Sequence, residues 1–425
     1  MRYLPQTKKN RAAMLDAIGV ADIEALYKDI PAGAFIKGKA DLPDHMGEME
    51  IERLLSSYAN ENHGASDGPF FLGAGTYNHH IPATVDYIIQ RSEFLTAYTP
   101  YQPEIAQGTL QVIYEFQTMI SQLTGQDVAN ASLYDGATAM AEAALMAMRV
   151  TKRKKIVLGN EIHPHYRGVL QSYVENFRGE ASIETGKPDL ETACVIVQSP
   201  DFFGSPAAYD EIRKTCDESG AMMVVVVNEI LSLGLLPAPQ MADIVCGEGQ
   251  SIGLPMSYGG PHLGFFACNE KYIRQMPGRL CGETVDASGK RGFVLTLSTR
   301  EQHIRREKAT SNICTNQGLC ALAFTVHMTL LGEDGFKTLA RLNHEKACEL
   351  ADALEAAGFK VETQNFFNEF VVEINKNAQQ TIDKLAAKGI IAGLAAGETK
   401  LLVAATEMTT DNDIAALVSA LKEAA

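Results

Sequence analysis

One turn in the sequence carries groups that could bind a charged ligand. The stretch "LYDGATAMAEA" (133–143) predicts a tight turn before a helix of small residues, and the turn residues are Asp135, Gly136, Ala137 and Thr138. Backbone N–H groups at the start of such a helix can bind an anion, and small residues let a phosphate approach them. The turn is also typical of a plain helix start capped by the Asp135 carboxylate. The motif alone favours this simpler interpretation.

Polar side chains also follow three later strand-like runs. His163 and His165 come after "KKIVLGN", Glu229 ends "AMMVVVVNE", and Gln250 lies in the loop "CGEGQSIGLPMSYGGPH" (246–262). An imidazole at a sheet edge can stack on a planar ligand or exchange protons, although His165 is better explained as a surface histidine. Because the carboxyl ends of parallel strands meet at one edge, we expect the turn residues, His163, Glu229 and Gln250 to line one pocket. Gln250 can neither attack nor titrate, so the pocket lacks a reactive group.

The elements that must position these residues form three regions. Residues 1–68 read as a helical extension, 69–333 as a large α/β domain, and 334–425 as a small α+β domain with antiparallel strands. In the large region, short continuous apolar runs alternate with amphipathic helices, which is typical of a mostly parallel sheet covered on both faces. The small region is predicted to begin with a long helix over 335–358.

Composition excludes several classes of function. The 425 residues carry a net charge of −15, which argues against a nucleic-acid partner, and the basic run "TKRKK" (151–155) is typical of a solvated face. The longest apolar run, "AMMVVVV", is too short to span a membrane. The eight cysteines form no CxxC pair and no grouping with histidine, so we expect no metal site. They fit buried thiols in a reducing compartment, and we expect a cytoplasmic protein.

The order of these parts resembles pyridoxal-phosphate enzymes of the aspartate-aminotransferase fold (type I). In that fold the strand-end acid pairs with the pyridinium nitrogen, and a lysine in the later loop holds the cofactor covalently. Gln250 stands at the lysine position, and an amide cannot form an imine. Glu229 is one methylene too long for the acid, Leu402 stands where transaminases usually carry an arginine, and Lys308 is too far along the chain to replace the lysine. A self-sufficient aminotransferase conflicts with these residues.

Longer motifs resemble one family, glycine decarboxylase, the P-protein of the glycine cleavage system. The resemblance covers essentially the whole chain, and the length matches the N-terminal, lysine-lacking half, which some bacteria encode separately as subunit 1. The motifs that carry it are "TAYTPYQPEIAQGTLQ" (96–111), "DVANASLYDGATAMAEA" (127–143), "SYGGPHLGFFA" (257–267), "MPGRLCGET" (276–284) and "TREQHIRREKATSNICT" (299–315).

The resemblance implies an enzyme that works only with a partner. Subunit 2 of such enzymes carries the lysine and its pyridoxal phosphate, so this chain would bind no cofactor covalently. The complex, expected as α2β2, would decarboxylate glycine, release CO2 and transfer the aminomethyl group to the lipoyl arm of H-protein. The alternative is a catalytically inert docking paralogue that stabilises subunit 2 or recruits H-protein.

The resemblance also implies that each site is completed across the interface. We expect Tyr98, Tyr101 and Arg300 to line the interface or the substrate pocket, although interface packing alone would explain the tyrosines. The phosphate of the partner's cofactor is expected to meet Thr310, Ser311 and Asn312. Arg305 and Arg306 could add charge there, or could form ion pairs with Glu301 or Glu307. Whether the chain's own vestigial pocket binds a ligand is left open.

Overall fold

The computed structural model describes residues 6–424, except 37, 39, 96–98 and 177–179 and the side chains of residues 300 and 424. The chain divides into two compact units, Met1–His63 and Gly64–Ala425. The first predicted boundary, after residue 68, lies close to this division, and the predicted domain limits stay a prediction.

The first unit is helical, and none of its described residues is buried. Its elements are α1 (Lys8–Ile18), η1 (Glu24–Tyr27), η2 (Ala32–Ala34) and α2 (Glu48–Ala59), and none of them contains a buried residue. The helix α1 ends at Gly19, which adopts the left-handed conformation (φ 81°) typical of a glycine cap. Several large apolar side chains of this unit are exposed, among them Met14, Ile18, Met49, Leu55 and Tyr58.

The second unit is built on a seven-stranded sheet with the order β1-β7-β6-β5-β4-β2-β3. The central strands pair in parallel, and β7 runs antiparallel to both β6 and β1. Each apolar run named above became a strand; β3, a short exposed strand, was missed because its sequence, "SIET", is mostly polar. The strands are β1 (Val128–Ala129), β2 (Lys155–Leu158), β3 (Ser182–Thr185), β4 (Thr192–Gln198), β5 (Met222–Val227), β6 (Ile244–Glu248) and β7 (Gly264–Cys268).

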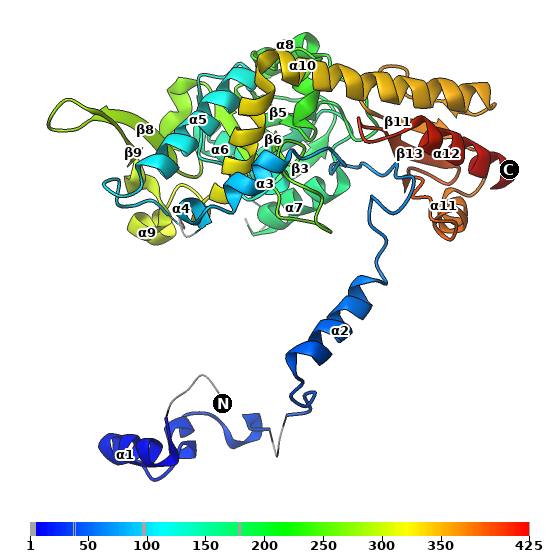
Figure 1. Cartoon of the computed structure of the whole chain (residues 1–425). Coiled ribbons are helices and arrows are strands. Elements are labelled where there is room, and N and C mark those ends of the chain that lie inside the picture. Colours follow the sequence, from blue (N-terminus) through cyan, green and yellow to red (C-terminus); the bar gives the residue numbers. More distant parts are fainter. Residues whose placement is uncertain (1–5, 37, 39, 96–98, 177–179, 425) are drawn as a thin grey trace. The chain divides into compact units, whose positions relative to one another are not determined.

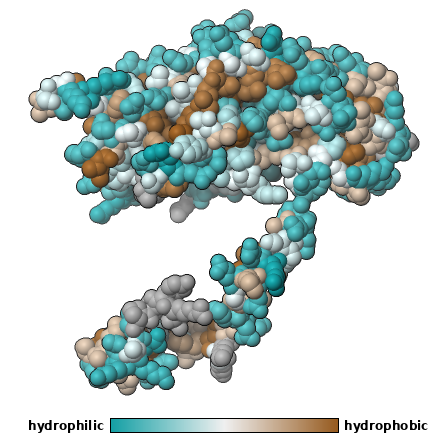
Figure 2. Space-filling view, viewed as in Figure 1, coloured by the Kyte–Doolittle hydropathy of each residue, from teal (hydrophilic) through white to brown (hydrophobic). Residues whose placement is uncertain are grey.

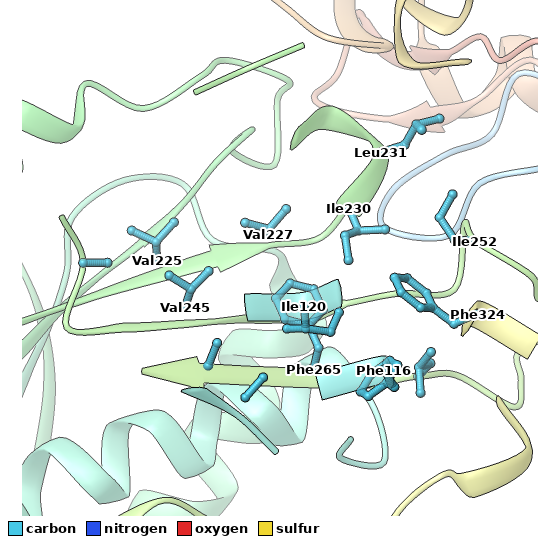
Figure 3. Close-up of a cluster of buried hydrophobic side chains, with 14 of the residues drawn as sticks. Phe116, Ile120, Val225, Val227, Ile230, Leu231, Val245, Ile252, Phe265 and Phe324 are labelled. Carbon is cyan, nitrogen blue, oxygen red and sulfur yellow. The ribbon is translucent and has the colours of Figure 1, made fainter. Parts of the chain in front are cut away.

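Both faces of this sheet are covered, which explains why its strands are apolar without interruption. Val225 and Val227 of β5 point to a core shared with Phe116 and Phe324 (Figure 3). The alternate residues of β5 point to a second core on the opposite face. The first core is covered mainly by α5 (Gln107–Thr124) and α10 (Gly318–Ala356), the second by α6 (Gly136–Thr151) and α7 (Pro164–Glu175).

A smaller antiparallel sheet lies at the far end of α10 (Figure 1). Its order is β10-β11-β13-β12, with strands β10 (Lys360–Val361), β11 (Glu369–Glu373), β12 (Leu394–Ala395) and β13 (Lys400–Ala404). The helices α11 (Ala378–Ala386) and α12 (Asp411–Ala424) pack with it. The helix predicted over 335–358 begins earlier, at Gly318, and is interrupted at Gly332 (φ 59°).

The remaining elements connect these layers. A two-stranded hairpin, β8 (Leu280–Val285) with β9 (Arg291–Thr296), was not anticipated from the sequence. The other helices are α3 (Ala83–Ile89), α4 (Ser92–Leu95), α8 (Tyr209–Ser219), α9 (Gln302–Arg305), η3 (Ile230–Gly234), η4 (Glu270–Gln275), η5 (Ser298–Arg300) and η6 (Arg306–Lys308). In the part of the chain that is described, no helix is long and apolar enough to cross a membrane. The expectation of buried thiols is wrong for Cys314, which is exposed.

Candidate functional site

The carboxyl edge of the large sheet brings most of the predicted pocket residues to one place. His163 follows β2, Glu229 follows β5, and Gln250 follows β6, because parallel strands end at the same edge. A further segment, Gly73–His80, runs over this edge and contacts all three side chains. The chain therefore fills much of its own pocket.

Gln250, at the expected lysine position, is fully engaged with the backbone. Its side-chain oxygen accepts a hydrogen bond from the Tyr77 N–H (3.2 Å), and its Nε2 donates to the carbonyls of Tyr77 (3.3 Å) and Leu254 (2.7 Å). The residue is only 1% exposed. The amide thus pairs with the Tyr77 backbone much as a neighbouring strand would, and position 250 presents no reactive group.

Two carboxylates occupy the anion position at the start of α6. Glu248, 3% exposed, accepts hydrogen bonds from the backbone N–H groups of Gly136 (3.0 Å), Gln250 (3.1 Å) and Leu263 (2.7 Å). Asp135 caps the helix by accepting a hydrogen bond from the Thr138 N–H (2.8 Å). This is the geometry of a plain helix start capped by a carboxylate. Because these N–H groups are already bonded to negative charges, a phosphate does not fit there.

Glu229 is bound within the chain. Its carboxylate accepts hydrogen bonds from Ser251 Oγ (2.9 Å) and the Leu231 N–H (3.0 Å), and it lies 3.2 Å from His79 Nε2. The other ring nitrogen of His79 lies 2.9 Å from Glu407. Burial opposes a charge on His79, but Glu229 and Glu407 outweigh it and raise its pKa to about 10. The Glu229 carboxylate, which would have to pair with a pyridinium nitrogen, therefore pairs with His79 instead.

The small sheet also holds the covering segment. Glu369 of β11 accepts hydrogen bonds from the Ala74 N–H (2.6 Å) and the Tyr77 hydroxyl (2.9 Å). Burial raises the pKa of Glu369 to about 7. A Cβ on Gly73 would lie 2.5 Å from the Glu369 carboxylate, so this close approach requires glycine. The segment is thus anchored to both sheets of the unit.

What remains of the predicted pocket is split. Asp135, Ala137 and His163 line an open cavity of about 420 Å³ together with the loop 259–262, whereas Glu229 lines a separate, water-sized cavity of about 10 Å³. Gln250 lines neither. His163 donates from Nε2 to the Ala74 carbonyl (2.7 Å), and burial lowers its pKa. These residues do not fit pyridoxal phosphate, because the covalent anchor, the phosphate donors and the ring acid are all absent or engaged.

A second group of residues gathers three of the quoted motifs around Arg279. Its guanidinium donates to the Tyr101 hydroxyl (2.9 Å) and to Thr315 Oγ1 (2.6 Å), and its Nε lies 3.3 Å from the Glu301 carboxylate. The Tyr101 ring packs edge-on against His303 with centroids 5.5 Å apart, and 52% of the tyrosine is exposed. We call these five residues the Arg279 cluster. Arg279 and Glu301 are buried, so the ion pair is a structural anchor.

The expected phosphate contacts lie in the same stretch of chain. Thr310 lines a cavity of about 400 Å³ together with Arg305 and Lys308. Ser311 Oγ accepts from the Ile313 N–H (3.1 Å), and the exposed Asn312 accepts from Gln302 through its carbonyl (2.7 Å).

Three sequence expectations in this stretch and its neighbour need comment. The alternative of an ion pair between Arg305 or Arg306 and Glu301 or Glu307 is not found among the described residues, and Glu301 pairs with Arg279 and His303. Tyr98 and the side chain of Arg300 lie outside the described residues.

Comparisons with known proteins agree on one family. The family model described as "Glycine cleavage system P-protein" matches residues 1–421. The chain belongs to the glycine cleavage system P-protein family. A curated relative from Caulobacter sp. (strain K31), named probable glycine dehydrogenase (decarboxylating) subunit 1, is 55% identical over 100% of this chain and 98% of its own length.

Solved structures place this P-protein chain in its fold. A crystal structure of glycine decarboxylase (P-protein) in inhibitor-bound form superposes with a TM-score of 0.90 at 41% identity, covering 100% of both chains. Glutamate decarboxylase of Lactobacillus brevis shares the fold alone, with a TM-score of 0.67 at 12% identity over 93% of this chain and 97% of that one. The resemblance to glycine decarboxylase subunit 1 and the pyridoxal-phosphate transferase fold are therefore confirmed.

Several residues that shape the site were missed by reasoning from sequence. Glu248 lies in the quoted loop, two residues before Gln250, and Arg279 lies in "MPGRLCGET". A carboxylate at a strand end could have signalled Glu248, and a cation inside a family motif could have signalled Arg279. Tyr77 and His79 carry no local signal, because their partners are distant in sequence.

Proposed function

We propose that this P-protein chain is the lysine-free subunit of a two-chain glycine decarboxylase. Gln250 is the observation that supports this proposal, because its amide stands at the lysine position and is hydrogen-bonded to the backbone of Tyr77 and Leu254. Pyridoxal phosphate, held covalently by subunit 2, supplies the electron sink for the loss of CO2 from glycine. The aminomethyl group then passes to the lipoyl arm of H-protein. The complex is an α2β2 assembly in the bacterial cytoplasm.

In this proposal the Arg279 cluster completes the partner's site. Arg279 fixes the Tyr101 hydroxyl by a charge-assisted hydrogen bond, while the exposed part of the ring remains available to substrate. Tyr98 and Arg300 belong to the same wall in this proposal. A hydroxyl group from Thr310 or Ser311 and the nearby Asn312 approach the phosphate of the partner's cofactor. The role of this chain is to position groups and exclude water.

Exposed apolar surface supports a large subunit interface. The first unit has no buried residue in its helices, although Met14, Met49 and Leu55 are exposed. Apolar side chains such as Leu319 and Leu330 are also exposed on the first half of α10, and Figure 2 shows apolar residues gathered there. Surfaces of this kind are typical of proteins that bury them against a partner.

The test is reconstitution from separately purified chains. We expect glycine-dependent CO2 exchange only when this chain, subunit 2 and lipoylated H-protein are mixed. Tyr101→Phe and Thr310→Val should each lower turnover about tenfold without preventing assembly, since each removes one hydrogen bond of about 1.4 kcal/mol. Arg167→Gln, on the exposed surface of α7, is the matched control.

Two outcomes would contradict the proposal. Unchanged turnover in assembled complexes of both variants would favour the docking paralogue. Covalent cofactor on this chain alone, removed by Lys308→Ala, would make it a self-sufficient enzyme.

A further inference from the structure

A cavity of about 400 Å³ beside the C-terminal end of α6 collects positive charge from four elements of the second unit. Its cations come from α6, η4, α9 and η6, and they are Arg149, Arg274, Arg305 and Lys308. The hydroxyl-bearing residues Thr299 and Thr310 line the same cavity. We call this the basic cavity. In a chain with a net charge of −15, such a gathering of cations is unexpected.

These charges are poorly compensated within the chain. No carboxylate is among the described residues that line the basic cavity. Behind it, Glu142 is fully buried, and neither of its carboxylate oxygens accepts a hydrogen bond of ordinary geometry. Burial raises the pKa of Glu142 to about 7 although Arg149 opposes the shift, so near neutral pH it supplies less than a full negative charge.

Arg149 itself has an unfilled donor. Its Nη2 donates to the Gln275 carbonyl (3.1 Å), but its Nε is buried without a partner among the described residues. A buried guanidinium donor that lacks an acceptor costs free energy, and four cations around one cavity repel one another. An anion in the cavity would relieve the repulsion among the four cations.

The basic cavity is distinct from the closed pocket around Gln250. Arg149 lies at the end of α6 opposite Gly136, and a 16-residue helix is about 24 Å long at 1.5 Å per residue. The N–H groups at the other end are already bonded to Glu248 and Asp135. Carboxylates thus lie at the N-terminal end of α6, whereas cations gather at its C-terminal end.

We infer that the basic cavity is an oxyanion-binding site whose preferred ligand is a phosphate group. Several cationic donors converging with hydroxyls suit a ligand with oxygens on all sides, and guanidinium groups can pair with two of them at once. The volume accommodates a phosphate with a small organic group attached. The phosphate could be that of a free ester or of the cofactor held by a partner chain. Binding by the isolated chain does not depend on the proposed function, whereas the cofactor as the source rests on the contact proposed there for Thr310.

The first test uses the purified chain alone. Isothermal titration with inorganic phosphate and with pyrophosphate should give saturable binding at a single site, stronger for pyrophosphate and weakened by salt. Arg274→Gln and Arg305→Gln, both at exposed positions, should each weaken binding about tenfold, since each removes a charge-assisted hydrogen bond. Arg167→Gln should bind like the wild type. Absence of saturable binding, or wild-type binding by both cavity variants, would overturn the inference.

A second measurement identifies the source of the phosphate. The complex with subunit 2 is titrated with inorganic phosphate before and after loading with pyridoxal phosphate. If the cofactor's phosphate occupies the basic cavity, only the unloaded complex should bind phosphate at this site. If both forms bind it, and Arg274→Gln weakens both, the cavity serves a separate phosphate ester. Failure of the mixed chains to decarboxylate glycine would contradict the proposed function and leave the result for the isolated chain intact.

Discussion

Two regions of the second unit differ in how their polar groups are bonded. Around Gln250 the carboxylates Glu229, Glu248 and Glu369 are all bonded to groups of the same chain, and a backbone segment covers them. Around Tyr101 and the basic cavity, side chains are held by hydrogen bonds within the chain but remain partly exposed. Polar groups that satisfy one another hold a structure together, whereas groups left without partners indicate where an external ligand belongs.

This contrast combines the fold of pyridoxal-phosphate enzymes with a pocket whose polar groups bond to one another. The carboxyl edge of the large sheet is stabilised by internal hydrogen bonds, so it acts as part of the core. The residues with remaining bonding capacity lie in the stretch 299–315 and its neighbours, which the proposal assigns to the partner's site. The predictions below test each side of the comparison.

The largest effect is expected from Arg279→Met. The change removes the donors to Tyr101 and Thr315 and leaves the Glu301 carboxylate buried without its cation. We expect exchange activity of the assembled enzyme to fall by about 100-fold and the unfolding free energy by about 3–5 kcal/mol, measured by urea denaturation. The double variant with Glu301→Gln should recover much of the stability but not the activity. Wild-type turnover in the single variant would contradict the role of the cluster.

His79→Gln should mainly reduce stability, because it leaves Glu229 and Glu407 buried without their shared cation. The cost should be about 3–5 kcal/mol. In the wild type the folded pKa of His79 is raised to about 10, whereas an unfolded histidine titrates near 6.5. Its stabilisation is therefore complete below about pH 6.5 and is lost as the pH rises towards 10.

The contribution of Glu407 to stability has the opposite pH dependence, because it is lost in acid rather than in alkali. Burial opposes the shift, but the hydrogen bond from His79 lowers its pKa to about 2, so its stabilisation is lost as the pH falls from about 4 towards 2. Urea midpoints measured from pH 2 to 10 should fall at both ends for the wild type. In His79→Gln the alkaline decline should be much shallower, and an unchanged alkaline slope would show that His79 is not charged in the folded protein.

Gln250→Lys should have a moderate effect on stability and should not create a cofactor site. A lysine cannot accept the Tyr77 N–H bond, so a buried donor is left unpaired at a cost of about 1–3 kcal/mol. Glu248 would still accept the hydrogen bond from the Gly136 N–H, which would then not be available to a phosphate. After incubation with pyridoxal phosphate, borohydride reduction and gel filtration, we expect no retained cofactor absorbance.

A second variant sharpens this experiment. Adding Glu248→Gln to Gln250→Lys removes the negative charge at the start of α6, and retention of cofactor by the double variant alone would identify Glu248 as the obstacle. Retention by Gln250→Lys alone would show that the pocket is less closed than the hydrogen bonds indicate.

The smallest effect is expected from Lys154→Ala in the run "TKRKK". Lys154 pairs with Glu180 on the surface, where both side chains are at least half exposed, and solvent screens such pairs strongly. Neither the thermal midpoint nor the activity should change measurably. A clear loss of either would mean that this surface is covered in the assembled enzyme, and it would extend the functional region beyond the stretch 299–315.

The sequence by itself determined the layered α/β fold, most strands of the large sheet and the absence of a lysine at position 250. These features follow from local periodicity and residue type, which act over a few residues. The polar strand β3 and the hairpin β8–β9 were missed because neither has an uninterrupted apolar run.

Only the tertiary structure decided what the candidate pocket became. Tyr77 meets Glu369 and His79 meets Glu407 across nearly 300 residues or more, and no local pattern records such contacts. The same holds for Arg279, which joins Tyr101 of one quoted motif to Glu301 and Thr315 of another. Long-range pairs of this kind depend on how whole layers pack, so the sequence identifies the family of the site, and the packing determines which of its groups remain available.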